Sequence, residues 1–141
     1  MLRSQLRPES FEQRQVGTLP ALLGIEVDAI AEGTITLSME IQGHHIAPNN
    51  GFLHAASVVA LADTAAGYGC VAHLPPGAGG FTTIELKANF LGTARSGRVV
   101  AIASLVHGGR STQVWDAVVR DEAGKTIALF RCTQMILWPK V

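Results

Sequence analysis

Residues 52–73 read FLHAASVVALADTAAGYGCVAH, and this stretch decides the fold. Apolar and small residues fill nearly all of it, which predicts one long helix that is buried over most of its surface. Its length approaches that of a membrane span. Because Asp63 interrupts the stretch and strand-like segments lie on both sides of it, we interpret it as the core helix of a globular domain.

Alternating apolar and polar residues on either side of this helix predict six strands. Residues 22–41 form two of them around a turn at 31–33, and the sequence LPPGAGG at 74–80 ends the helix. The remaining four strands span residues 81–91, 98–107, 111–120 and 125–138. A single helix among strands that follow one another predicts an α+β fold, in which an antiparallel sheet curls around the helix.

The predicted domain takes up residues 21–141 and follows a polar N-terminal arm at 1–20, which carries a short helix at 10–15. Within the strand at 81–91, every second residue is expected on the apolar face: Thr82, Ile84, Leu86, Ala88 and Phe90. Phe81 and Thr83 fall on the opposite face in this interpretation.

Composition excludes several classes of protein. The chain has 141 residues, 48% of them hydrophobic, with 11 basic and 11 acidic side chains. No basic stripe suggests a nucleic-acid partner, and no apolar segment near the N-terminus suggests secretion, so we expect a cytoplasmic protein that binds no membrane. Cys70 and Cys132 lie in apolar segments, which predicts buried thiols in a reducing compartment. The histidines have no metal-ligand spacing, so no metal is expected.

Asp63 is the first candidate for chemistry. Its helical neighbours, such as Val59, Ala60 and Gly67, are small or apolar. Burial without partners disfavours a charged carboxylate and raises its pKa, and perturbed acids of this kind cluster at working sites. The alternative is a structural role, in which the carboxylate binds a loop or pairs with a basic residue at an interface.

Asn49, Asn50 and Gly51 precede the helix and form the second candidate. Asn-Gly is ordinary turn chemistry, and Asn is a common helix N-cap. The turn also leads directly into a helix N-terminus, where free N–H groups suit an oxyanion or a polarised carbonyl. The structural and functional interpretations are compatible.

His54 lies nine residues before Asp63. On a helix that spacing is about 900°, which sets the two side chains on opposite sides and about 13 Å apart along the axis. They cannot meet within one chain if both are helical. If both serve one site, a second subunit must bring them together, and a two-fold dimer would build two equivalent sites.

Other chemistry-bearing residues have weaker signals. Ser57 lacks the surroundings of a serine-hydrolase nucleophile, and the glycines at 77–80 lack the Lys-Ser/Thr of a phosphate loop. The pair His44-His45 is expected in a solvated loop. Thr82 or Thr83 could orient a water or a carboxylate. Arginine side chains in turns are expected to be exposed or, as a cluster, to hold a phosphate: Arg95, Arg98 and Arg110.

The segments Asn50-Gly51-Phe52-Leu53-His54 and Leu61-Ala62-Asp63-Thr64-Ala65 resemble the hotdog-fold thioesterases. Within these, the chain looks like the acyl-CoA thioesterases related to phenylacetate degradation, the PaaI-like group. The resemblance runs from about residue 22 to 138 and includes the strand that begins Thr82-Thr83-Ile84-Glu85-Leu86.

The resemblance implies an antiparallel sheet around one helix, paired subunits that form a homodimer or a homotetramer, and hydrolysis of an acyl-CoA without a cofactor, CoA being part of the substrate. It implies Asp63 as nucleophile or general base and Thr83 as a water-placing hydroxyl. From the other subunit, it implies Gly51 as the N–H that polarises the thioester carbonyl, assisted by His54 or Asn50. Substrate-binding roles are expected for Asn49, Thr82 and Arg110.

Two short segments depart from the family pattern. His54-Ala55-Ala56 stands where relatives commonly carry His-Gly-Gly, and Pro48 stands where relatives tend to place an amide. Which of the two asparagines acts is therefore open. Two alternative functions also remain: a hotdog dehydratase or hydratase, and a non-catalytic module that binds acyl-CoA.

Overall fold

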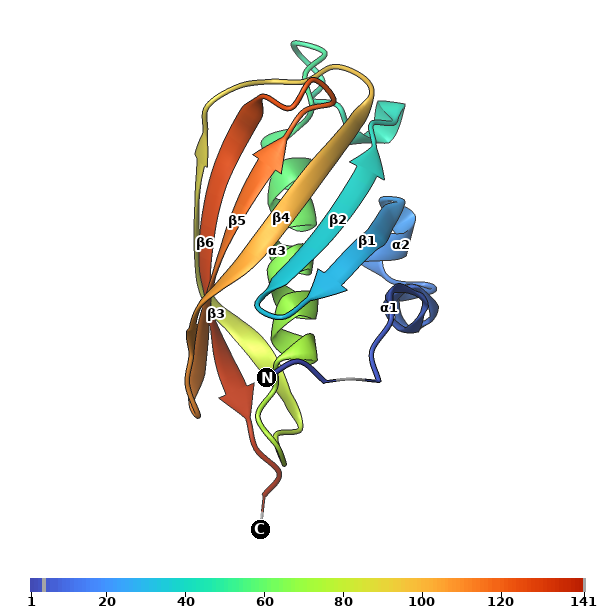
Figure 1. The fold of residues 1–141 in the computed structure, drawn as a ribbon. Coiled ribbons are helices and arrows are strands. Elements are labelled where there is room, and N and C mark those ends of the chain that lie inside the picture. The colour runs from blue at the N-terminus through green and yellow to red at the C-terminus, as the bar shows by residue number, and fades with distance from the viewer. Residues whose placement is uncertain (4, 141) are drawn as a thin grey trace.

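The computed structural model describes residues 1–3 and 5–140, and its elements follow the predicted order (Figure 1). The helices are α1 (Pro8–Gln15), α2 (Leu19–Leu22), the 3-10 turn η1 (Gly43–His45) and α3 (Ala55–Ala72). The strands are β1 (Ile25–Ala31), β2 (Thr34–Glu40), β3 (Gly80–Phe90), β4 (Arg98–Gly108), β5 (Thr112–Arg120) and β6 (Thr126–Leu137).

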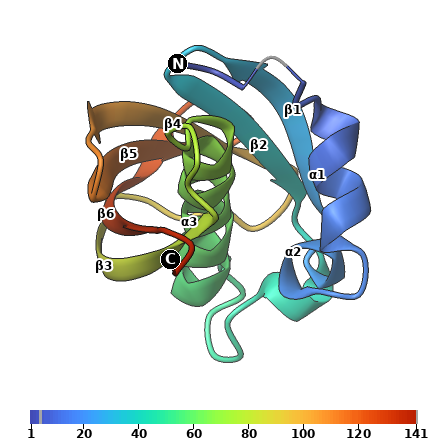
Figure 2. The ribbon, with the colours of Figure 1, turned by 90° about the horizontal axis from the view of Figure 1, so that it is seen from below.

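All six strands form one antiparallel sheet in the order β1-β2-β4-β5-β6-β3. Seen from below, the sheet curves around α3, while α1 and α2 lie beyond the β1 edge (Figure 2). The helix packs on β2, β3, β4, β5 and β6. The predicted α+β hotdog architecture is therefore confirmed, and β1 and β3 are its two edge strands.

The core helix is shorter than the predicted residues 52–73. It begins at Ala55 and ends at Ala72, because an isolated bridge between Ile46 and Leu53 keeps the preceding residues extended. His54, rather than an asparagine, is the N-cap. The helix is long and apolar enough to cross a bilayer by length and composition, but 56% of it is buried inside the fold, as expected of a core helix.

Small residues let α3 approach the sheet closely. A Cβ atom on Gly69 would lie 2.7 Å from the Trp115 ring on β5, and one on Gly67 would lie 3.0 Å from Phe81 on β3. Trp115 is fully buried, with its indole N–H donating to Gln113 at 2.8 Å. The stretch is Ala/Gly-rich because the helix lies directly on a large aromatic side chain.

The N-terminal arm packs on the domain. Phe11 of α1 is 2% exposed and stacks on Tyr68 of α3, with 4.7 Å between ring centroids. Gln15 connects the two layers, since its amide donates to the Ile25 carbonyl and accepts from the Tyr68 hydroxyl. The helix predicted at 10–15 is thus present and begins two residues earlier, at Pro8.

The face assignment of β3 was wrong for its first half. A register shift against β6 between Thr83 and Glu85 inserts one residue, so the alternation changes phase there. Before the shift, Phe81 and Thr83 pair with the buried residues Ile136 and Gln134 and face the helix, while Thr82 is exposed on the outer face. After it, Leu86, Ala88 and Phe90 take the helix side, as predicted.

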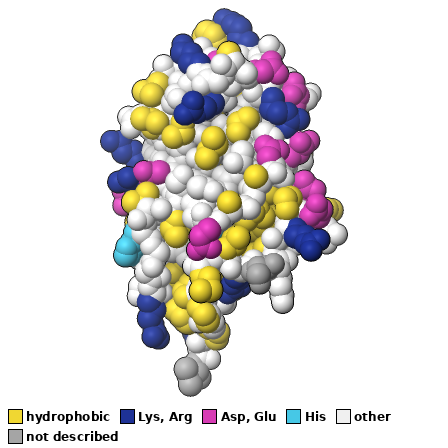
Figure 3. All heavy atoms as spheres, in the orientation of Figure 1, with side chains coloured by type: hydrophobic (Ala, Val, Ile, Leu, Met, Phe, Trp, Pro, Cys, Tyr) yellow, Lys and Arg dark blue, Asp and Glu magenta, His cyan; other side chains and the backbone are white. Residues whose placement is uncertain are grey.

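The outer face of the sheet carries few large patches of one kind. Figure 3 views this face and shows scattered apolar side chains with charged groups mainly along its margins.

Cys70 and Cys132 lie on the inner side, where both are buried free thiols, as predicted. Burial raises the pKa of each thiol to about 12, so both stay protonated at neutral pH.

Candidate active site

Asp63 is half-buried at the middle of α3 and faces the β3–β6 edge of the sheet. Its one hydrogen bond within the described residues comes from the Thr83 hydroxyl, at 3.4 Å. Burial raises the pKa of the Asp63 carboxyl above its ordinary value, and the Thr83 bond lowers it by less. A carboxylate whose desolvation is offset by so few hydrogen bonds can readily accept a proton or attack an electrophile.

A buried glutamine completes the surroundings of Asp63. The Thr83 hydroxyl lies 2.8 Å from Gln134 Oε1 on β6, which is closer than its distance to Asp63. The Gln134 amide nitrogen donates in turn to Cys132 Sγ at 3.3 Å. Gln134 is 0% exposed. The sequence pattern did not predict Gln134 as a site residue, because the strand that contains it has several polar positions.

The turn before α3 holds Gly51 in a conformation that favours glycine, with φ of +71°. Asn50 Oδ1 accepts from the Phe52 N–H at 2.9 Å, and Arg95 donates to the Asn50 carbonyl at 3.1 Å. The Arg95 guanidinium also lies 4.1 Å from the Phe52 ring centroid. Within the described chain the Gly51 N–H has no hydrogen-bond partner, so it is free for a ligand.

His54 caps α3 through its side chain. Its Nδ1 accepts from the Ala56 N–H at 2.9 Å, so the proton of the neutral ring resides on Nε2. The ring is exposed. His54 can therefore fix the start of α3 through Nδ1 and donate from Nε2 to a bound carbonyl. The hydrogen bond from the Ala56 N–H limits the direction in which Nε2 points.

His45 is a structural residue that the sequence analysis assigned wrongly to solvent. It is 0% exposed, and its Nδ1 accepts from the Gln42 N–H at 3.0 Å. Its carbonyl accepts from the His54 N–H at 2.9 Å and from the Ser57 hydroxyl at 3.1 Å. Burial, and after it the neighbouring His44, lowers the pKa of His45. The neutral His45 ring therefore holds the turn in place through the Gln42 N–H. The Ser57 hydroxyl is used in a structural hydrogen bond to the His45 carbonyl.

A hollow of about 370 Å³ opens beside this turn. Its walls are mainly apolar and include Phe52, Leu53, Val58, Phe90 and Ile127. Asn50 and His54 supply the polar part of the lining. An apolar hollow with a few polar groups at one end suits a ligand with an apolar body and a polar reacting group.

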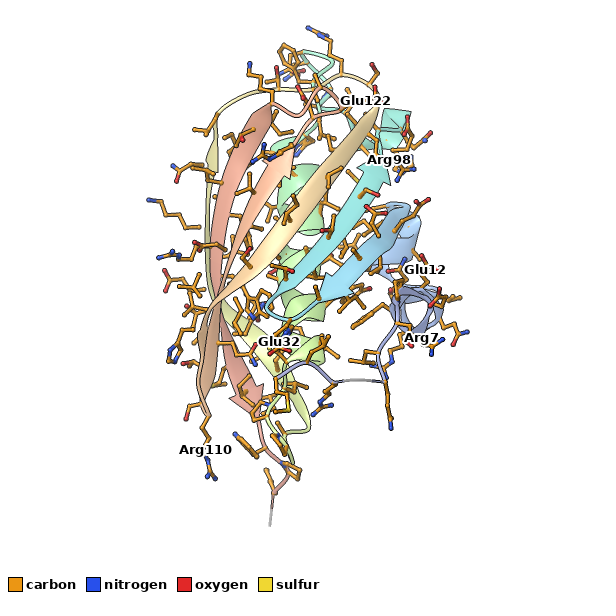
Figure 4. All side chains as sticks on the ribbon, in the orientation of Figure 1. Arg7, Glu12, Glu32, Arg98, Arg110 and Glu122 are labelled. Atoms are coloured by element: carbon orange, nitrogen blue, oxygen red, sulfur yellow. The ribbon has the colours of Figure 1, made fainter. Side chains whose placement is uncertain are left out.

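The remaining candidates are dispersed. Asn49 is exposed in the turn. Arg110 lies at the end of the molecule opposite Arg98 (Figure 4), where its guanidinium covers the Trp138 ring at 5.0 Å. Arg98 pairs with Glu26 at 3.1 Å. The three arginines therefore form no phosphate cluster within one chain. Among the residues described, no cluster of metal-ligand side chains occurs.

The chain brings Asp63 to Thr83, and it brings Asn50, Gly51 and His54 to each other. It does not join the two groups. Asp63 is nine residues beyond the N-cap, half a helical turn out of phase and about 13 Å along the axis. One chain therefore presents two separate groups of candidate residues.

Comparison with known proteins identifies the family. Residues 50–128, more than half of the chain, match the thioesterase superfamily. The chain belongs to that superfamily. This matched region contains Asn50 and Gly51 of the turn, the whole of α3 and the strands β3, β4 and β5, so Asp63, Thr83 and His54 also lie within it.

Relatives of this thioesterase act on CoA thioesters by name. It is 34% identical over 115 residues to 1,4-dihydroxy-2-naphthoyl-CoA hydrolase of Listeria monocytogenes, covering 82% of this chain and 92% of that one. It is 31% identical over 132 residues to the Escherichia coli enzyme of the same name, covering 92% and 93%. The thioesterase is thus an enzyme of the acyl-CoA hydrolase class.

Solved structures support the same family. A mutant thioesterase from Pseudomonas aeruginosa superposes with a TM-score of 0.91 at 30% identity, covering 96% of this chain and 97% of that one. The PaaI protein of E. coli, from the phenylacetic acid degradation operon, superposes with a TM-score of 0.81 at 24% identity, covering 92% and 89%, which is a likeness of fold. The resemblance drawn from the two motifs is confirmed for superfamily and fold.

Proposed function

We propose that this thioesterase hydrolyses an acyl-CoA with Asp63 as its working carboxylate, at a site that two subunits complete. The observation that carries the proposal is the environment of Asp63: half-buried, with a raised pKa and a single long hydrogen bond from Thr83. An acid that served only structure would have close partners to compensate its burial.

The reaction needs an electrophile and an attacking group. The Gly51 N–H of one subunit would donate to the thioester oxygen, with His54 Nε2 or an asparagine of the turn assisting. Asp63 of the other subunit would take a proton from water as the water oxygen bonds to the carbonyl carbon, and Thr83 would help to place that water. The C–S bond then breaks, and the proton passes to the departing CoA thiolate.

Covalent catalysis is the second form of the same proposal. Asp63 would bond to the acyl carbon, expel the CoA thiolate and leave a mixed anhydride, which water then hydrolyses to the free acid. Both forms need the ionised carboxylate and both consume one water. Neither involves a metal or a cofactor apart from the CoA of the substrate.

A homodimer through β3 would unite the two groups of candidate residues. This strand pairs only with β6 among the described strands, and it exposes apolar side chains at its free edge: Ile84 at 55%, Leu86 at 42% and Phe90 at 48%. A free, apolar edge is normally covered in a stable protein. Antiparallel pairing with a second β3 would bring Asp63 of one subunit towards the Gly51 turn of the other, and two such dimers could form a tetramer.

We further propose an aromatic acyl group as the substrate class. The hollow beside the turn is lined by Phe52 and Phe90, and its volume of about 370 Å³ suits a small ring system. The two hydrolases named above act on a naphthoyl thioester. A panel of naphthoyl, phenylacetyl, short-chain and long-chain acyl-CoA substrates tests this, with the highest kcat/KM expected for an aryl thioester.

Substitution of Asp63 tests the mechanism. Asp63→Asn keeps the size of the side chain but removes its basicity, so we expect kcat to fall about 100- to 10,000-fold. Release of CoA is measured with a thiol reagent, and gel filtration verifies the oligomer. Asp28→Asn is the matched control, because Asp28 accepts a hydrogen bond from Ser38 far from the turn. Near-normal turnover by Asp63→Asn would exclude this carboxylate as the working group.

A further inference from the structure

A chain of polar side chains connects Asp63 to the interior of the sheet. It runs from Asp63 on α3 through the Thr83 hydroxyl on β3 to Gln134 and Cys132 on β6. Gln134 and Cys132 are 0% and 1% exposed. A fully buried amide beside a site carboxylate is costly unless its hydrogen bonds are satisfied, and this one uses both ends.

The hydroxyl of Thr83 has a single proton and two neighbouring acceptors. Gln134 Oε1 lies at 2.8 Å and Asp63 Oδ1 at 3.4 Å. A hydrogen bond between oxygens is strong near 2.7–2.8 Å and weak beyond about 3.2 Å. The Thr83 hydroxyl therefore donates its main hydrogen bond to Gln134 Oε1 and only a weak one to Asp63.

We propose that Gln134 is a positioning residue of this site: by accepting the hydrogen bond of the Thr83 hydroxyl, it withholds a full hydrogen bond from Asp63 and so keeps that carboxylate basic. The proposal rests on Asp63 being the working carboxylate. A donated hydrogen bond stabilises the charged form of an acid, so diverting that bond preserves the affinity of Asp63 for a proton.

Few other groups can influence Asp63 within the chain. Among the described residues, the titratable groups on the helix side nearest to Asp63 are Cys132 of β6, with Cys70 and Tyr68 of α3. His45 and His54 lie at the N-terminal end of α3, and the buried His73 lies at its C-terminal end, where its Nε2 accepts from the Gly33 N–H. Tyr68 is turned toward α1, where it donates to Gln15. Glu85, Lys87 and the Asp116–Arg131 pair lie on the outer face of the sheet. The strands β2, β4 and β5 present apolar residues to the helix: Leu37, Met39, Val99, Ala101, Trp115 and Ala117.

The test is the titration of Asp63 itself. Carboxyl-labelled aspartate is followed by NMR in the intact oligomer, and the Asp63 signal is assigned by its absence in Asp63→Asn. Gln134→Met keeps the side-chain length but removes the acceptor, which frees the Thr83 proton for Asp63. We expect the pKa of Asp63 to fall by on the order of half to one pH unit, and the acid limb of kcat/KM to move with it.

A second substitution separates positioning from packing. In a Thr83→Val background there is no proton to divert, so adding Gln134→Met should leave the pKa of Asp63 unchanged. Gln113→Met is the matched control: Gln113 pairs in register with Gln134, is 1% exposed, and binds the His73 carbonyl and Trp115 instead. We expect it to lower the Tm without moving the Asp63 titration.

An unchanged or raised Asp63 pKa in Gln134→Met overturns the proposal, as does an equal shift in the Thr83→Val background. If Gln134→Met fails to fold, Gln134→Asn withdraws the acceptor by one methylene and is expected to shift the titration in the same direction. The NMR titration needs no turnover, so its result does not depend on the catalytic mechanism. Loss of activity in Asp63→Asn tests the proposed function, whereas the shift of the Asp63 pKa in Gln134→Met tests the role of Gln134.

Discussion

Asp63 lowers the stability of the fold at neutral pH, which is the cost of keeping a basic carboxylate. Burial is the larger influence and raises its pKa above the value of an unfolded chain. The folded state therefore binds the proton more tightly than the unfolded state does. Below the ordinary aspartate pKa of about 3.9, both states are protonated and the penalty is absent; as pH rises through the folded-state pKa, the penalty develops fully.

This linkage predicts that Asp63→Asn is more stable than the parent at pH 7. The amide that replaces the carboxylate has no charge to desolvate, so the Tm should rise, and the gain should shrink as the pH approaches about 3.9. Thermal unfolding across pH measures it. A lower Tm at pH 7, or a gain that does not depend on pH, would contradict the uncompensated burial inferred for this side chain.

Some site residues could be predicted from sequence, and others could not. Asp63 was recognisable because it is the one acid in an apolar helix. Gln134 and His45 were not, since their burial depends on sheet curvature and on bonds to segments distant in sequence. Periodicity alone could not distinguish Thr83 from Thr82, because a register shift decides which of the two faces Asp63; only the family resemblance assigned Thr83.

At the scale of elements, the order of strands and helix followed from periodicity alone, while the ends of α3 did not. The helix starts at Ala55 because the Asn50-Gly51 turn and the Ile46–Leu53 bridge hold the chain extended until His54. Residues 52–54 are Phe, Leu and His, none of which breaks a helix, so the local pattern continues the helix through them. Long-range pairing, which no local pattern contains, overrides that preference.

The contact between α3 and β5 gives a prediction about stability. Gly→Ala inside a helix normally stabilises by about 1 kcal/mol. At Gly69, however, the new methyl would lie 2.7 Å from the buried Trp115 ring, so we expect Gly69→Ala to cost about 1–3 kcal/mol of unfolding free energy. Gly67→Ala is the control, because its neighbour Phe81 is only partly buried and can move. Urea denaturation measures both; a stabilised Gly69→Ala would show that the helix and sheet are loosely packed.

At the scale of the whole molecule, the free edge of β3 has no partner strand among the described residues of one chain. Leu86 on that edge is 42% exposed, while Ile102 on the central strand β4 is 38% exposed. We expect Leu86→Lys to dissociate the dimer and to abolish turnover, because it places a charge in the proposed interface. Ile102→Lys changes a side chain of similar exposure and should remain a dimer. Light scattering with gel filtration measures both masses, and an intact Leu86→Lys dimer would argue against pairing through β3.

The catalytic roles, the oligomeric state and the cytoplasmic location remain predictions, whereas the exposed β3 edge and the separation of Asp63 from the turn before α3 are properties of the folded subunit. The separation agrees with the spacing of His54 and Asp63 in the sequence, which implies a second copy if both residues serve one site.

Complementation between two inactive variants tests the shared site most directly. Asp63→Asn and Gly51→Val, each inactive as a homodimer, are co-expressed with different tags, and the heterodimer is isolated by two affinity steps. One of its two sites then combines an intact Asp63 with an intact Gly51 from the other subunit, so we predict about half of the parent kcat per dimer. If both residues serve the same site within one chain, every site in the heterodimer carries a defect, and an inactive heterodimer would contradict the account.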